Sequence, residues 1–275
     1  MSKTSAVLET QKSEQRTERL RQRIMPFIGI LVFLVIWEIL VIVLNIKPYL
    51  LPRPTTVLQT IIERWSTLLE HGWVTAYEML VGYFVAIAVG VPLAIFITAS
   101  PTFDRFITPI LLFAQTVPKI AIAPLFLIWF GFGMAPKVWV AFLISFFPIV
   151  IDTAVGLRSI STDMIDLARS MGATRTQIFT RFRLPTSLPY LFSGLKVAAT
   201  LAVVGAVVGE FVGADKGLGY LLLVANSNLQ TALLFATIVF LTFQGLILFY
   251  IIEFLERLLI PWHVSQRTGT EHATM

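Results

Sequence analysis

Long apolar stretches, separated by short polar segments, make up more than half of the chain. They cover residues 26–44, 74–98, 106–130, 137–157, 186–213 and 231–260. Each stretch is close to the roughly 20 residues that an α-helix needs to cross the hydrocarbon core of a bilayer. The pattern therefore predicts an all-α membrane protein with six transmembrane helices.

Small residues and prolines give two kinds of stretch a more specific character. Glycine or alanine recurs every four residues in 74–98 and again in 186–213. Such a stripe lets another helix approach closely, so we expect both to be packing helices. The stretch 106–130 is instead interrupted by Pro109, Pro118 and Pro124. Each interior proline removes a backbone hydrogen bond, which predicts a broken helix that lines a cavity.

The segment between the first two stretches has a different pattern. Pro52 and Pro54 exclude a regular helix at its start, and apolar residues then follow at helical spacing up to residue 69. This spacing predicts a short amphipathic helix at the membrane surface.

The charge distribution predicts the orientation. Hydrophobic residues make up 56% of the chain and charged residues 13%, against roughly 45–50% and about 25% in soluble domains. Of the 21 Lys and Arg, 14 fall in the N-terminal tail, the segments around residues 105 and 158–185 and the C-terminal end, and five fall on the other side. The positive-inside rule therefore predicts cytoplasmic termini and a cytoplasmic 158–185 loop. Because the positive charge is explained in this way, no nucleic acid partner is expected.

Several classes of chemistry are excluded by what the chain lacks. It has no cysteine and only three scattered histidines, so neither redox nor zinc chemistry is expected. It contains no phosphate-binding loop, zinc-binding HExxH helix or GxSxG nucleophile elbow. We expect no cofactor, and a membrane-embedded enzyme is disfavoured.

Ionisable residues within the apolar stretches are candidates for a translocation path. Lys119, with Gln115 and Pro118, lies in a proline-distorted segment; it either faces a cavity, or snorkels to the interface or pairs with Asp152. For Lys196 an electrostatic tie to a neighbouring helix is favoured over solute contact. Glu210 begins a glycine-rich passage, and the sequence does not decide between a gate and a structural turn.

The 158–185 loop contains a predicted helix with an exposed apolar face. Ser161, Thr162 and Asp163 supply capping oxygens at its start, and Gly172 stands where a helix C-terminal glycine belongs. Four apolar residues share one face by their spacing: Met164, Leu167, Ala168 and Met171. By physical reasoning alone, this helix either lies on the membrane or docks into a partner protein.

The same loop resembles the "EAA" motif of the permease subunits of ATP-binding-cassette importers. The motif positions are Asp166, Leu167, Ala168, Gly172, Phe182, Leu184 and Pro185. Aspartate replaces the motif glutamate and leucine replaces its middle alanine, but the spacing is intact. Further segments, among them "VPKIAIAPLFLIWFGFG" and "GEFVGADKGLGYLL", are similar to the nitrate/sulfonate/taurine-type branch, which also includes permeases for pyrimidine vitamin precursors and riboflavin.

The resemblance implies a type I ABC importer permease fold in the bacterial plasma membrane, with a coupling helix between spans 4 and 5. That helix, with Asp163, Met164, Asp166, Leu167, Ala168, Met171 and Gly172, would dock into a cytoplasmic ATPase. An extracytoplasmic solute-binding protein and a second permease copy, hence a homodimer within membrane lipid, are the other implied partners. ATP hydrolysis would belong to the ATPase, so the chain itself is expected not to be an enzyme.

The resulting division of the chain is a cytoplasmic tail at 1–23, the first span and external amphipathic segment at 24–73, the permease core at 74–262 and a cytoplasmic tail at 263–275. The alternative function is an ion-coupled secondary carrier, for which only Asp152 is a candidate carboxylate. The solute itself is left open: a sulfonate, taurine or nitrate anion suits the two lysines, and a pyrimidine precursor or riboflavin is the other class.

Overall fold

The computed structural model describes residues 24, 25 and 27–261, and this part of the chain is helical and contains no strand. The helices are Phe27–Val43, α2 (Pro54–Glu63), α3 (Trp65–Ala99), α4 (Pro101–Thr116), α5 (Lys119–Phe130), α6 (Met134–Arg158), α7 (Thr162–Ser170), α8 (Arg175–Ile178), α9 (Leu184–Gly213), α10 (Leu218–Ser227) and α11 (Thr231–Leu259). A π-helical segment, Phe179–Arg183, joins α8 to α9. The tails at 1–23 and 263–275 lie outside the described residues.

Helix α6 lies at the centre of the packing, between α3 and α9. The expected small-residue stripe of α3 is buried, and a Cβ added at Gly82 would lie 2.6 Å from the Ala141 Cβ of α6. The stripe of α9 contacts α6 in the same way: added Cβ atoms at Gly205 and Gly209 would lie 2.6 and 2.7 Å from the Cα atoms of Ala141 and Lys137. The prediction that these are closely packed helices is confirmed.

Two predicted boundaries differ from the structure. The amphipathic helix ends at Glu63, and Trp65 already begins the 35-residue α3, so the residues from 65 to 69 belong to the following span. Similarly, Arg175–Gly213 forms one apolar helical run of 39 residues, which begins well before the expected residue 186. Only Arg64 separates the amphipathic helix from α3, and Pro185 lies in the first turn of α9, where a proline does not interrupt a helix.

The proline-rich stretch is broken, as predicted, but only at Pro118, because Pro109 and Pro124 lie inside α4 and α5. Helices α4 and α5 meet at an angle of 96°, and Val117 and Pro118 between them are extended. Pro118 cannot donate a backbone hydrogen bond, and it disfavours helical geometry at Val117. The first helix of the pair starts at Pro101, five residues before the expected span.

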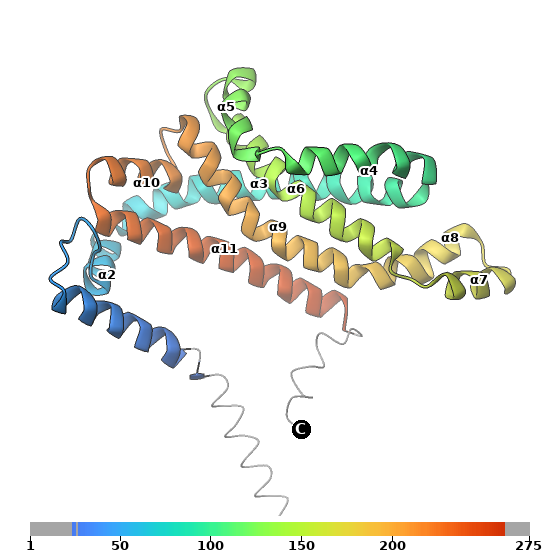
Figure 1. Cartoon of the computed structure of the whole chain (residues 1–275), viewed down its shortest axis with the longest axis horizontal. Helices are drawn as coiled ribbons and strands as arrows, with labels where there is room; N and C mark the ends of the chain where they lie inside the picture. The colour runs from blue at the N-terminus through green and yellow to red at the C-terminus, as the bar shows by residue number, and fades with distance from the viewer. Residues whose placement is uncertain (1–23, 26, 262–275) are drawn as a thin grey trace, which may run out of the picture.

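By length and composition, four described helices can cross a membrane, and five if the bent α4–α5 pair counts as one span. The helix Phe27–Val43 is apolar but shorter. The hairpin that carries α7 and α8 lies at one end of the molecule, and α2 and α10 lie at the opposite end (Figure 1). The chain is thus a multi-pass helical membrane protein with short helices at both ends.

Candidate functional site

Helix α7 and the residues that follow it form the loop hairpin, by which we mean residues 159–183. The Ser161 side chain accepts a hydrogen bond from the Met164 backbone N–H and caps the helix, as predicted. At the other end Gly172 adopts a φ of 80°, and the Gly172 and Ala173 N–H groups donate to the Arg169 and Ala168 carbonyls. This is a Schellman termination, which requires the left-handed backbone that glycine adopts at no steric cost.

The two sides of α7 have different environments. Ile165 and Ala168 are buried against Ile178 of α8, whereas Met164 and Leu167 are exposed. Ala168 therefore does not share the exposed face predicted for it, because its small side chain allows α7 to lie close to α8. Met171, which is 80% exposed, extends the exposed face beyond the helix end. Asp163 and Asp166 are also exposed, and Asp166 pairs with Arg169 at 3.0 Å.

The loop hairpin is continuous with the membrane-crossing part of the chain. Thr174 caps α8 in a reciprocal capping box with Gln177. The chain then passes through the π-helical segment into α9 without leaving helical geometry, and Phe182 of that segment packs on the hairpin's apolar cluster. The loop hairpin and α9 are thus joined by a continuous helical path.

The break between α4 and α5 is held by Lys119. Its Nζ donates to the Gln115 carbonyl at 2.9 Å and lies 4.7 Å from the centroid of the Phe147 ring of α6. The last carbonyls of a helix have no partner within the helix, so the ammonium group supplies one for Gln115. The alternative pairing of Lys119 with Asp152 is not formed in the described structure. Gln115 and Pro118 are exposed at this break.

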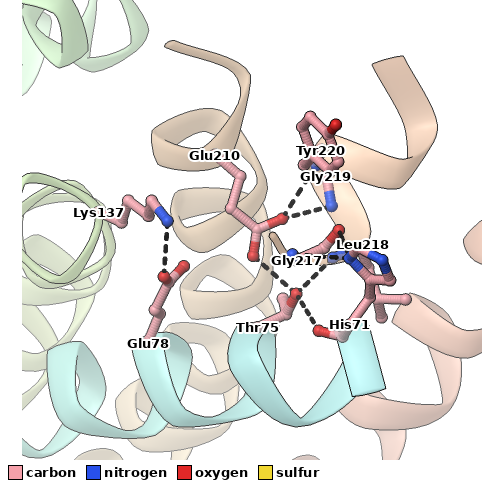
Figure 2. Close-up of polar contacts among 9 residues, drawn as sticks. All are labelled: His71, Thr75, Glu78, Lys137, Glu210, Gly217, Leu218, Gly219 and Tyr220. Carbon is pink, nitrogen blue, oxygen red and sulfur yellow. Dashed lines mark hydrogen bonds and ion pairs between the residues drawn. The ribbon is translucent and has the colours of Figure 1, made fainter. Parts of the chain in front are cut away.

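A second cluster, at the opposite end from the loop hairpin, holds the N-terminus of α10 (Figure 2). The Gly217 N–H donates to His71 Nδ1 at 3.0 Å, and the Leu218 N–H donates to Thr75 Oγ1 at 2.7 Å. The Gly219 and Tyr220 N–H groups both donate to the Glu210 carboxylate. All four N–H groups that an isolated helix leaves unpaired at its start thus have side-chain acceptors from α3 and α9.

The contacts of Glu210 decide between the alternatives left open by the sequence. Its carboxylate is buried and also accepts a hydrogen bond from Thr75 Oγ1 at 2.6 Å. An added Cβ at Gly217 or Gly219 would lie 2.2 or 2.7 Å from Glu210 side-chain atoms, so the glycines make room for the carboxylate. These contacts are those of a structural turn, and the expected place of Glu210 on the translocation path stays a prediction.

An ion pair that the sequence analysis missed lies beside this cluster. Lys137 Nζ is 3.1 Å from Glu78 Oε1, and both side chains are almost completely buried (Figure 2). Lys137 lies in the first turn of α6, and its side chain faces Glu78 of α3. Nearby on the surface, the Glu70 carboxylate raises the pKa of Lys216 through a hydrogen bond and its negative charge.

Lys196, also expected on the path, has a partner within the chain. Its Nζ lies 2.8 Å from Glu256 Oε2 of α11, and both side chains are largely buried. This pair is the electrostatic tie that the sequence favoured for Lys196. On the same helix, Glu253 and Arg257 form a second ion pair, four residues apart.

Residues 24, 25 and 27–261 contain no group of three or more His, Asp or Glu side chains arranged to hold a metal ion.

Comparisons with known proteins agree on one family. Residues 86–262 match the family described as binding-protein-dependent transport system inner membrane component. The formylaminopyrimidine transport permease protein of Halalkalibacterium halodurans is 37% identical over 250 residues, which cover 90% of this chain and 100% of that protein. The riboflavin transport system permease protein of Chloroflexus aurantiacus is 34% identical over 240 residues, covering 86% and 90%. The taurine transport system permease protein of Escherichia coli is 29% identical over 239 residues, covering 84% and 87%.

A solved structure is similar in fold. An inward-facing conformation of the MetNI methionine ABC transporter contains a chain with 22% sequence identity and a TM-score of 0.58. The match covers 72% of the chain described here and 97% of the solved chain.

Proposed function

The chain belongs to the family of binding-protein-dependent transport system inner membrane components, and from this premise we propose that it carries a small solute inward as the permease subunit of an ATP-binding-cassette importer. The loop hairpin would couple the solute path to a cytoplasmic ATPase. ATP hydrolysis would occur on that partner, because the chain contains no phosphate-binding loop.

The observation that carries this proposal is the exposed apolar surface of the loop hairpin. Met164, Leu167 and Met171 are 47%, 57% and 80% exposed, although they lie in a polar loop. Clustered apolar groups of this kind mark a surface that another molecule covers. Asp163 and Asp166 would border the docked surface, while Ala168 and Gly172 would act indirectly, by fixing α7 on α8 and ending it.

Coupling would proceed through α6 and α9, the two helices that flank the loop hairpin. Their glycine-mediated packing leaves little space between them, from Gly156 beside Tyr190 to Gly209 beside Lys137. A displacement of the docked hairpin would therefore tilt α6 and α9 together and open the path alternately to each side.

The solute path would run along the broken α4–α5 pair, with Gln115, Pro118 and Lys119 at the break. No residue of α4 is buried within the chain, which leaves this helix free to face a second permease copy across the path. We propose a homodimer surrounded by membrane lipid, with an extracytoplasmic binding protein delivering the solute to the α2–α10 end. The solute would come from the classes named by the relatives, a vitamin precursor such as a pyrimidine or riboflavin, or a taurine-like, sulfonate or nitrate anion.

The proposed topology has six spans: the helix Phe27–Val43, α3, the α4–α5 pair, α6, α9 and α11. Both termini and the loop hairpin would be cytoplasmic in a bacterial inner membrane. The 14-to-5 distribution of Lys and Arg supports this orientation.

The test is whether the loop hairpin retains the ATPase. Leu167→Asp would bury an unpaired carboxylate against the partner, and we expect it to lose both ATPase copurification and solute uptake while inserting normally. Thr174→Asp, exposed on the same hairpin but off the apolar surface, is the matched control and should retain the ATPase. Ala168→Asp should also fail, but by loosening α7 from α8, which a thermal melt of the purified permease would detect. Full ATPase retention and uptake by Leu167→Asp would contradict the coupling role and favour the ion-coupled carrier.

A further inference from the structure

A cavity of about 250 Å3 lies between α4 and α6. Apolar side chains of α3, α4 and α6 form most of its wall, and its polar lining residues are Thr108, Gln115 and Arg158. Arg158 is the last residue of α6, so the cavity borders the start of the loop hairpin. Gln115 is also one of the residues proposed for the solute path.

Asp104 binds two of the polar lining residues, Thr108 and Arg158, near the loop-hairpin end of the cavity. Its Oδ1 accepts a hydrogen bond from Arg158 at 2.7 Å and another from Thr108 Oγ1 at 2.6 Å. The guanidinium charge is thereby balanced within the chain. Within the described structure the Gln115 carboxamide makes no hydrogen bond, which leaves it as the polar group available to a ligand.

Helix α4, which forms one wall of the cavity, is a separate element between two breaks. Ser100 before it and Val117 after it are both extended, and α4 has no buried residue. The Asp104–Arg158 ion pair ties the start of α4 to the end of α6. Breaking this pair would release the helix from α6 at that end.

We propose that this cavity holds the solute before its release to the cytoplasm, and that the solute is a small uncharged ring with hydrogen-bonding edge groups. The Asp104–Arg158 ion pair is the latch, which means that it holds α4 against α6 and keeps the cavity closed. This inference rests on the proposed function and chooses among its solute classes. A carboxamide offers both a donor and an acceptor to the edge of a heterocycle. An inorganic anion or a sulfonate would find no free cation in the cavity lining, because Arg158 is the charged lining residue and is already paired with Asp104.

The size of the cavity supports the same choice. Sites for drug-sized ligands are typically about 300–1,000 Å3. The smaller cavity suits a single ring of the pyrimidine type better than a tricyclic flavin with its side chain.

The experiment measures protection of a cysteine in the cavity wall, and the cysteine-free chain allows a single reporter. In the full-length permease, assembled with its ATPase in lipid nanodiscs, Ala154→Cys is labelled with N-ethylmaleimide, with and without a formylaminopyrimidine, taurine or nitrate. We expect the pyrimidine alone to slow labelling several-fold, and Gln115→Leu in the same background to abolish this protection. Phe113→Cys, on α4 but outside the cavity lining, is the control and should not be protected.

The latch is tested with the same reporter. Asp104→Asn should speed labelling of Ala154→Cys several-fold, and the charge exchange Asp104→Arg with Arg158→Asp should restore the slow rate. An unchanged rate in Asp104→Asn overturns the latch.

Each other outcome overturns a defined part of the proposal. Protection by taurine or nitrate instead of the pyrimidine overturns the solute class. Protection by none of the three probes, or protection that follows added lipid, overturns the site, and the latter assigns the cavity to an acyl chain. ATPase retention is measured on the same samples, so a complex that keeps its ATPase but shows no protection rejects the cavity assignment and leaves the proposed function intact.

Discussion

Gly205 of α9 lies so close to Ala141 of α6 that a Cβ added at Gly205 would be 2.6 Å from the Ala141 Cα. On the opposite side of Ala141, Gly82 of α3 makes an equally close approach. One alanine is thus enclosed by glycines of two neighbouring helices. The three-helix core depends on the absence of side-chain volume at these points.

Gly205→Val should therefore separate α9 from α6. Forcing extra volume into a closely packed core costs about 1–3 kcal/mol, and here the neighbouring atoms are backbone atoms, which cannot rotate away. A thermal melt of the purified protein should show the loss. Gly29→Val is the matched control, since an added Cβ there has no neighbour within 4 Å, and it should melt like the unmodified protein. Equal melting of the two variants would contradict the packing described.

Lys137→Met should destabilise the fold strongly. Removing one partner of a buried ion pair leaves the other charge uncompensated, at a cost of about 3–5 kcal/mol, and two carboxylates, Glu78 and Glu210, would remain in that region. Glu78→Gln combined with Lys137→Met should recover part of the loss, which a double-mutant cycle of thermal stabilities measures. The exposed Glu70–Lys216 pair is the comparison: Lys216→Met should melt close to the unmodified protein.

Gly219→Ala should loosen α10. Its Cβ would lie 2.7 Å from Glu210 Oε2, so the carboxylate would have to withdraw from the helix N-terminus. Hydrogen exchange at the α10 amides should become faster while exchange in the α6 core is unchanged. Unchanged protection of the Gly217–Tyr220 segment would show that Glu210 is not what holds it.

Gly172→Val should weaken ATPase binding through the backbone alone. The φ of 80° strains a β-branched residue, but no atom lies within 4 Å of an added Cβ, so a steric clash does not contribute. Gly172→Asn should be milder, because asparagine tolerates left-handed geometry. ATPase copurification of the two variants provides the measurement, and equal retention would show that the Schellman termination does not matter for docking.

Single cysteines test the proposed orientation. Replacements of Ser66 and Asn228, both exposed at the α2–α10 end, should react with an impermeant thiol reagent in intact cells. A replacement of Thr174 in the loop hairpin should react only after the membrane is permeabilised. Labelling at Thr174 from outside would reverse the topology.

The packing of the core could be predicted from the sequence because it depends on local spacing. A small residue every fourth position lies on one helix face whatever the partner, and Pro118 removes a backbone hydrogen bond at the observed break, although Pro109 and Pro124 of the same stretch do not break their helices. The buried environment of Lys137 carries no comparable signal, since it depends on Glu78 in a helix that is distant in the sequence. Lys196 and Glu256 are a second case of the same kind.

The exposed surface of α7 was predicted only in part. A nine-residue helix with apolar residues on both sides has two candidate buried faces, one containing Ile165 and the other Leu167. Contact with Ile178 of α8 decides between them, and this contact depends on the direction in which the chain turns after Gly172. Periodicity alone could not supply that direction.

The π-helical segment Phe179–Arg183 sets the rotation of the loop hairpin about the helix axis relative to α9. An α-helix turns about 100° per residue, and a π-turn accommodates one extra residue without leaving the helical path. Removing one residue there would rotate Ile178 by roughly 100° about the helix axis, relative to the part of α9 in the membrane. The π-helical turn thus determines the orientation of α7 about the axis of α9. Gaining or losing a single residue there would turn the hairpin toward an ATPase groove at a different position.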